Sequence, residues 1–257
     1  MKWDAVQYDS VKAPQADAGK ELIAMANIKS SDAVLDIGCG TGKLTLELSL
    51  LAHEGTVTGI DPSGEMLAKA GEISGGRDNM RFLLVPAQSM GFTGEFDLVF
   101  SNSALQWVPE QREVIGRVYR SLKKGGRVAF QLPAKNFCRE FFAYTSAAIT
   151  LLGFEKYFQQ WQSPWYLPEK EEYENLLEEE GFGNIHVFSR DYRLVFNSVG
   201  DIISWWSSAG LRPFLELLPE REQEYFKYAV AMSYESNRTN RGIEFDFRRL
   251  FVFAEKR

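Results

Sequence analysis

The stretch 33–42 constrains the fold more than any other part of this chain. An apolar run, residues 33–37, is typical of a buried strand, and three glycines follow it on alternate positions, Gly38, Gly40 and Gly42. A glycine has no Cβ, so the backbone can turn tightly there and a ligand can lie against it. We therefore expect a sharp turn from a buried strand into a helix, with a small-molecule site beside the turn.

The first half of the chain repeats this strand-then-helix order. Further apolar strands are expected at residues 56–61, 80–85, 96–102 and 127–133. Helices are expected at about 16–28, from about 42, after the N-cap Ser63, and at 111–122. Strands that are almost continuously apolar and alternate with helices are typical of a parallel sheet covered on both faces. The pattern predicts an α/β fold: a Rossmann-like, seven-stranded, mostly parallel sheet with helices on both faces.

After residue 133 the pattern changes. Residues 137–160 and 198–238 have helical, aromatic-rich patterns, and two late strands are expected at 184–196 and 245–256. No repeat, low-complexity segment or linker divides the chain. We expect one domain over 1–257, with helical lid insertions at about 137–168 and 198–240 above one edge of the sheet.

Charge and cysteine content exclude several classes of partner. The net charge is −6 and the pI is about 5.2, whereas binding to nucleic acid needs clustered Lys and Arg. The two cysteines, Cys39 and Cys138, have neither metal-type nor disulfide-framework spacing. The N-terminus has no apolar signal core, and no run of 18 apolar residues occurs. We expect a cytoplasmic protein with no metal, nucleic-acid or membrane partner.

Two acids indicate which cofactor suits the glycine turn. In open parallel sheets a ligand binds beyond the carboxyl ends of the strands. A nicotinamide fingerprint, G-x-G-x-x-G, would place its third glycine where Lys43 stands. Asp36, at the end of the first strand, suits the cationic sulfonium and amino groups of S-adenosylmethionine (SAM). Asp61, at the end of the second, can accept from both hydroxyls of a ribose.

These motifs also resemble a known family. VLDIGCGTG, followed by GIDPS and GEFDLVFSNSALQWV, is similar to the cofactor motifs of class I SAM-dependent methyltransferases. The resemblance implies SAM as the cofactor. The cofactor-binding residues that we predict are Tyr8, Asp36, Gly38, Gly40, Gly42, Asp61, Pro62, Met66, Ala87, Gln88 and Asn102.

A closer resemblance extends to both ends of the chain. The segment 102–108 (NSALQWV) and the segment 205–215 (WWSSAGLRPFL) resemble trans-aconitate methyltransferases and related small-carboxylate O-methyltransferases. The resemblance implies methyl-ester formation on a small carboxylic acid by a monomer or homodimer. The substrate-binding residues that it implies are Trp107, Gln106, Arg212 and Trp3.

The expected chemistry needs no catalytic side chain. A carboxylic acid is already ionised at neutral pH, so no general base is required and none is assigned. Arg212 could pair bidentately with the acceptor carboxylate, and the Trp107 indole N–H could donate to it. His53 and His186 are expected to be structural or surface residues.

One position departs from the family pattern. After the third strand such proteins usually place an Asp that accepts from the adenine amino group, and Pro86 stands there in this chain. The adenine contact would then come from the Gln88 side chain, a backbone carbonyl or water. A different or modified cofactor is the other explanation.

Several alternatives remain open from the sequence. The acceptor could be a carboxylate on an acidic carrier protein, for which Arg238, Arg241, Arg248 and Arg249 could form a basic patch. It could also be a small amine or phenol. A non-catalytic SAM-binding protein and a nicotinamide oxidoreductase are the alternatives from other classes.

Overall fold

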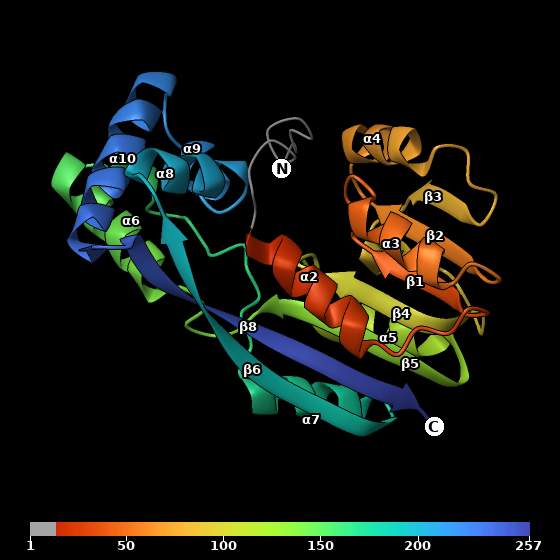
Figure 1. Cartoon of the computed structure of the whole chain (residues 1–257). Coiled ribbons are helices and arrows are strands. Elements are labelled where there is room, and N and C mark those ends of the chain that lie inside the picture. The colour runs from red at the N-terminus through yellow and green to blue at the C-terminus, as the bar shows by residue number, and fades with distance from the viewer. Residues whose placement is uncertain (1–13) are drawn as a thin grey trace.

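The computed structural model describes residues 14–257, with side chains from residue 18 onward. One sheet organises the described chain, in the order β3-β2-β1-β4-β5-β8-β6 (Figure 1). The strands are β1 (Ala33–Ile37), β2 (Thr56–Asp61), β3 (Met80–Leu84), β4 (Phe96–Asn102), β5 (Leu122–Pro133), β6 (Phe182–Phe196), β7 (Arg238–Thr239) and β8 (Gly242–Lys256). The first five are mutually parallel, and β8 runs antiparallel between β5 and β6. The predicted Rossmann-like sheet is confirmed; the two-residue β7, paired with β8, was not expected.

Helices cover both faces of this sheet. They are α2 (Pro14–Met25), α3 (Lys43–Leu51), α4 (Gly64–Ser74), α5 (Gln111–Ser121) and α7 (Lys170–Glu179). Leu22 of α2 and Leu48 of α3 are buried against one face, and Val114 of α5 and Leu177 of α7 against the other. Ser63 is the N-cap of α4, as predicted, because its Oγ accepts from the Met66 N–H at 3.3 Å.

A second group of helices, which we call the helical cap, packs at the far ends of β6 and β8 (Figure 1). It consists of α6 (Arg139–Leu152), α8 (Val199–Ser208), α9 (Arg212–Leu215) and α10 (Glu220–Ser233). Within the helical pattern expected at 137–160, α6 ends at Leu152, where Gly153 takes a left-handed conformation (φ 65). β6 and β8 are long enough to join sheet and cap: Phe245 of β8 is buried among cap residues, whereas Phe251 belongs to the sheet core.

Aromatic rings form most of the core of the cap. Phe141 of α6 stacks on Trp206 of α8 with ring centroids 4.0 Å apart. Trp205 stacks on Phe196 and Phe245 at the tips of β6 and β8. The high aromatic content of the second half therefore serves packing first, and it also supplies rings to a cavity that opens between the cap and the sheet.

Candidate active site

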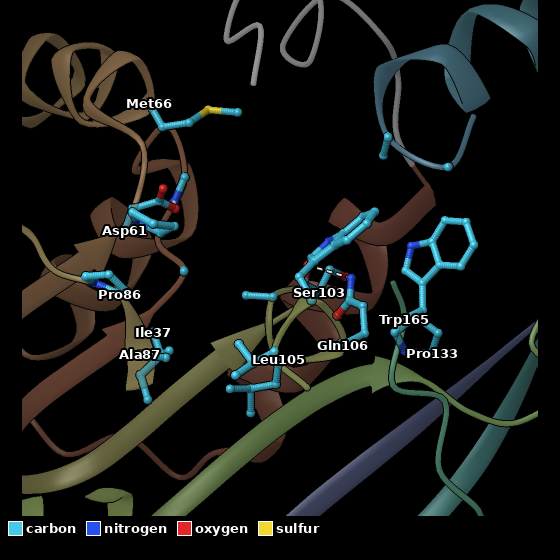
Figure 2. A pocket seen from close by; sticks show the side chains of 18 of the residues that line it. Ile37, Asp61, Met66, Pro86, Ala87, Ser103, Leu105, Gln106, Pro133 and Trp165 are labelled. Carbon is cyan, nitrogen blue, oxygen red and sulfur yellow. Dashed lines mark hydrogen bonds between the residues drawn. The ribbon is translucent and has the colours of Figure 1, made fainter. Parts of the chain in front are cut away.

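A cavity lies at the carboxyl ends of the parallel strands, facing the cap (Figure 2). One half, which we call the cofactor half, is built from the ends of β1, β2 and β3 and the turns after them. Its lining residues are Ile37, Gly38, Gly40, Ile60, Asp61, Pro62, Met66, Val85, Pro86, Ala87 and Gln88. The other, the acceptor half, comes from the turn after β4, the end of β5 and the residues after it, the loop before α7, the cap and β8. Its lining includes Ser103, Gln106, Trp107, Pro133, Phe137, Trp165, Trp205, Trp206, Gly210, Phe247 and Arg249.

The three glycines of the first turn have three different reasons to lack a side chain. A Cβ on Gly38 would lie 2.2 Å from the Cβ of Ala104, so Gly38 lets the turn after β4 approach the turn after β1. A Cβ on Gly42 would meet Ala70 of α4 at 3.0 Å, so Gly42 serves helix packing, and it does not line the cavity. Gly40 lines the cavity and has no atom within 4 Å of its would-be Cβ. Gly40 is therefore the position that leaves room for a ligand against bare backbone.

Asp61 places a buried carboxylate in the cofactor half. Its two oxygens accept from the Gly40 N–H at 3.0 Å and the Ser63 N–H at 2.8 Å. Burial raises the pKa of this carboxyl, and the two backbone hydrogen bonds oppose the rise. Both oxygens are thus fixed in position, and each keeps a lone pair for a ligand hydroxyl.

Asp36 lies at the end of β1, as its motif position predicts, but its side chain points away from the cavity lining. Its side chain is buried, accepts from the Thr45 hydroxyl at 2.7 Å and does not line the cavity. Burial raises its pKa to about 7, Thr45 opposes the rise, and the nearby charge of Asp61 adds to it. In this conformation Asp36 ties the end of β1 to α3 through its hydrogen bond to Thr45.

The segment after β3 closes the side of the cofactor half. Val85, Pro86, Ala87 and Gln88 all line the cavity, and a short 3-10 helix, η1 (Ala87–Ser89), begins directly after Pro86. Figure 2 shows Pro86 and Ala87 on the same side of the cavity as Asp61 and Met66. Most of this surface is apolar and suits a flat aromatic base, and Gln88 is its polar side chain.

The turn after β4 supplies the centre of the cavity. Ser103 has a left-handed backbone (φ 58), unusual for a residue with a side chain. Its N–H donates to the Gln131 carbonyl at 2.8 Å, and its own carbonyl accepts from Gln106 Nε2 at 2.8 Å. Gln106 Oε1 is buried and makes no hydrogen bond to any residue between 14 and 257, which leaves it available to a ligand donor. Trp107 follows in the short 3-10 helix η2 (Leu105–Trp107). The centroids of its ring and the Trp165 ring are 5.7 Å apart.

The cap supplies an aromatic wall to the acceptor half. The sequence predicted an aromatic-rich lid but not which of its rings line the cavity. The indole N–H of Trp206 donates to the Tyr234 hydroxyl at 3.0 Å, which fixes the ring. A Cβ on Gly210 would lie 2.4 Å from that ring, so the glycine of the 205–215 motif is needed for close contact with Trp206. Arg212 begins α9 just beyond Gly210 and is not among the residues that line the cavity.

Other predicted residues also lie elsewhere. The side chain of Asn102 lies against Gly19 of α2 and does not line the cavity. Trp3 and Tyr8 fall outside the described residues. His53 and His186 are exposed and away from the cavity. Sequence reasoning gave no cavity role to Arg249, because only the register of β8 against β5 brings that residue to the site.

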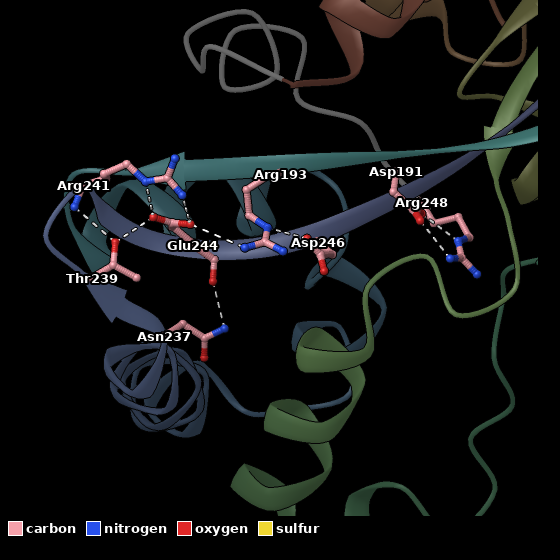
Figure 3. A network of polar contacts seen from close by, with 8 residues as sticks. All are labelled: Asp191, Arg193, Asn237, Thr239, Arg241, Glu244, Asp246 and Arg248. Atoms are coloured by element: carbon pink, nitrogen blue, oxygen red, sulfur yellow. Dashed lines mark hydrogen bonds and ion pairs between the residues drawn. The ribbon is translucent and has the colours of Figure 1, made fainter.

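The arginines considered as a basic patch for a carrier protein are not free, and Figure 3 shows Arg241 and Arg248 paired with acids. Arg248 pairs with Asp191 at 2.7 Å, Arg241 with Glu244 at 2.7 Å, and Arg238 with Glu235 at 2.6 Å. Arg249 is buried and lines the cavity. The possible basic patch is not supported, because each exposed arginine of the cluster pairs with a neighbouring acid.

The residues of the cofactor half fit SAM. The open space over Gly40 suits the methionine part of SAM, and the fixed carboxylate of Asp61 suits its ribose. The apolar surface from Met66 to Ala87 suits its adenine base. Between residues 14 and 257 no cluster of His, Cys, Asp and Glu could hold a metal ion, and no helix there has the length and apolar character needed to cross a bilayer. Fold and cavity together define a SAM-dependent methyltransferase.

Comparisons with known proteins give the family. A family model described as a methyltransferase domain matches residues 28–181. A trans-aconitate 2-methyltransferase of Deinococcus radiodurans is 32% identical, with 85% of this chain and 84% of that protein covered. One from Escherichia coli O1:K1 is 29% identical over 99% of this chain and 98% of that protein. The chain belongs to this methyltransferase family.

Solved structures support the same fold. The YcgJ protein of Bacillus superposes with a TM-score of 0.66 at 17% identity, covering 94% of this chain and 99% of that one. A phosphoethanolamine N-methyltransferase of Haemonchus contortus, solved with S-adenosylhomocysteine, gives a TM-score of 0.60 at 19% identity. It covers 93% of this chain and 52% of that one. These structures show the fold, and the methyltransferase-domain match over residues 28–181 argues against the nicotinamide alternative.

Proposed function

We propose that this enzyme transfers a methyl group from SAM to a carboxylate of a small carboxylic acid, with trans-aconitate as the first acceptor to test. The curated relatives are named for trans-aconitate, and the proposal extends this substrate to the present chain. The relatives match the chain over nearly its full length, cap included. We further propose that it acts in the cytoplasm as a monomer or homodimer, with no nucleic-acid partner.

One observation supports a carboxylate over an amine or phenol. Among the described residues that line the cavity, Asp61 is the only acid, and no His, Lys, Cys or Tyr is present. Asp61 lies in the cofactor half, held by two backbone N–H groups. A protonated amine or a phenol must lose a proton to react, whereas a carboxylate is already a nucleophile at neutral pH. The lining favours an acceptor that needs no base.

The proposed roles follow the two halves. Bound SAM supplies an electrophilic methyl group on a sulfonium. Asp61 would accept from the ribose hydroxyls, Gly38 and Gly40 would leave room for the cofactor chain, and Ala87 and Gln88 would contact the base. Asp36 and Gly42 would support this half through α3 and its packing on α4. Pro62 and Met66 complete its lining.

In the acceptor half, the residues would orient the acid and exclude water. Trp107 and Gln106 come from one turn that Ser103 holds in place. The rings of Trp165, Trp205 and Trp206 line this half and would shield a bound acid from solvent. Positioning and dehydration of an ionised carboxylate are the contributions such a transfer requires.

The test follows release of S-adenosylhomocysteine over a panel of trans-aconitate, cis-aconitate, other di- and tricarboxylates, a phenol and a primary amine. We expect turnover with at least one polycarboxylate and none with the phenol or amine. Turnover confined to the phenol or amine would contradict the proposal, as would SAM binding with no turnover on any carboxylate.

A further inference from the structure

Arg249 stands out because it is a buried cation in the wall of the cavity. It lies on β8 opposite Pro133 of β5 in the antiparallel register, at the edge of the sheet where the cavity opens. Only 2% of its surface is exposed. A guanidinium keeps its charge at any physiological pH, so this strand brings a permanent positive charge to the acceptor half.

Neighbouring groups hold that guanidinium in a fixed orientation. Its Nη2 donates to Gln131 Oε1 and to Ser103 Oγ. Its Cζ lies 5.2 Å from the centroid of the Phe247 ring, two residues earlier on the same strand. Ser103 is the left-handed residue that also positions Gln106. The cation and the acceptor-side turn are thus one connected unit.

The charges of the cavity are separated between its halves. Among the described lining residues, Arg249 is the only cation and Asp61 the only anion. They stand on β8 and β2, which are four strand spacings apart in the sheet order, roughly 19 Å at about 4.8 Å per spacing. A positively charged cofactor at the Asp61 end and a negatively charged acceptor at the Arg249 end would each meet a complementary charge.

Arg249 has a further advantage over the arginine that the motif suggests. Arg212 does not line the cavity in this conformation, whereas Arg249 does, between Phe247 and the end of β5. Aromatic rings make up much of the surrounding lining. Charge-assisted hydrogen bonds from a planar guanidinium to a carboxylate are strong and directional in apolar surroundings.

We propose that Arg249 binds a carboxylate of the acceptor and so fixes the acid in the cavity. This inference rests on the proposed function, because it requires an acidic acceptor. It assigns the recognition of negative charge to β8 and the turn after β4, and not to the 205–215 motif.

The experiment compares Arg249→Met with Arg248→Met and Arg212→Met, using trans-aconitate as the probe. Arg249→Met keeps the aliphatic volume and removes the charge. Arg248 is the next residue on the strand, is paired with Asp191 and does not line the cavity, so it is the matched control. For each variant we would measure acceptor KM and kcat, and the Kd of S-adenosylhomocysteine by calorimetry.

We expect Arg249→Met to raise the acceptor KM at least tenfold, the size of a lost charge-assisted hydrogen bond. Its Kd for S-adenosylhomocysteine should stay within about threefold of the original, because the cofactor half is intact. Arg248→Met and Arg212→Met should leave the acceptor KM within about threefold. Arg249→Lys keeps the charge but loses the planar guanidinium, so its acceptor KM should lie between those of the wild type and Arg249→Met. If Arg249→Met does not fold, Arg249→Lys provides the same test.

Three results would overturn the inference. An unchanged KM in both Arg249 variants, with the wild type active on trans-aconitate, removes Arg249 and leaves the proposed function intact. A large KM increase in Arg212→Met alone returns the role to the lid motif. A wild type that neither binds nor methylates any carboxylate of the panel removes this inference together with the proposed function.

Discussion

The cofactor half of the cavity takes its residues from three successive strand-to-helix turns, whereas the acceptor half gathers them from five places between residues 103 and 249. In the cofactor half each functional residue lies within a few positions of the strand end that places it. In the acceptor half Trp206, Gly210 and Arg249 depend on how the cap packs and how β8 registers on β5. A site built locally can be read from motif spacing, and a site built from distant segments needs the folded chain.

The cofactor half also contains the acid of the site, Asp61, and Asp36 supports it from the core. The largest effect that we expect is a dependence of folding stability on pH that comes from this buried carboxyl of Asp36. Burial raises the pKa of Asp36 from 3.8 to about 7. The folded chain therefore holds this proton more tightly than the unfolded chain between those pH values. Stability from this group is complete below about pH 4 and is lost as the pH rises to about 7, a loss of about 4 kcal/mol at most.

Asp36→Asn removes that titration. The free energy of unfolding of the variant, minus that of the wild type, should rise between pH 4 and pH 7 and level off above. Urea unfolding at pH 4.5, 6 and 8 measures it. A difference that stays constant with pH would show that Asp36 is not a buried acid of the kind described.

The next prediction concerns the close contact between the turn after β1 and the turn after β4, where Gly38 meets Ala104. In Gly38→Ala the new Cβ would lie 2.2 Å from that of Ala104, and the backbone has φ 71. Overpacking and the left-handed conformation together should cost about 2–4 kcal/mol of stability, and the displaced turn after β4 should reduce turnover.

Gly40→Ala is the matched control for that change. Its Cβ meets nothing within 4 Å, so its stability loss should be only about 1 kcal/mol, with SAM affinity falling instead. Thermal unfolding and SAM calorimetry separate the two variants. Equal stability losses would contradict the distinct roles assigned to these glycines.

The cofactor half depends next on Asp61. Asp61→Ala removes the carboxylate that Gly40 and Ser63 hold in position. We expect SAM binding more than tenfold weaker by calorimetry, while acceptor KM at saturating SAM changes little. Unchanged SAM affinity would refute the ribose assignment.

The smallest effect concerns the arginines outside the cavity. Arg248 and Asp191 form a pair in which both side chains are well exposed, 41% and 54%, and such pairs contribute about 0–1 kcal/mol. Arg248→Met should therefore lower the free energy of unfolding by less than about 1 kcal/mol. A larger loss, measured by urea unfolding, would mean that the strand depends on this ion pair.

The difference between the two halves explains which features could be predicted from the sequence. The order of strands and helices was predictable because the apolar periodicity of a covered parallel sheet is local. Gly40, Asp61 and the 103–108 turn were found at the cavity because short motifs fix them. Asp36 was placed at the right strand end, but its side chain turns into the core toward Thr45.

Arg249 could not be found in the same way. In the segment 245–251, F-D-F-R-R-L-F, Arg248 and Arg249 look equivalent in sequence. The pairing of β8 with β5 and β6 sends Arg249 inward to Gln131 and Ser103 and leaves Arg248 beside Asp191. Strand register is a tertiary property, and a shift of one residue would exchange the two.

The most direct test of a cavity divided into a cofactor half and an acceptor half is a pair of calorimetric titrations on Asp61→Ala and Arg249→Met. SAM is titrated into each variant alone, and trans-aconitate into each variant saturated with S-adenosylhomocysteine. The account predicts opposite losses: Asp61→Ala weakens SAM at least tenfold and spares trans-aconitate, whereas Arg249→Met weakens trans-aconitate at least tenfold and spares SAM. Two variants that each weaken both ligands alike would contradict it.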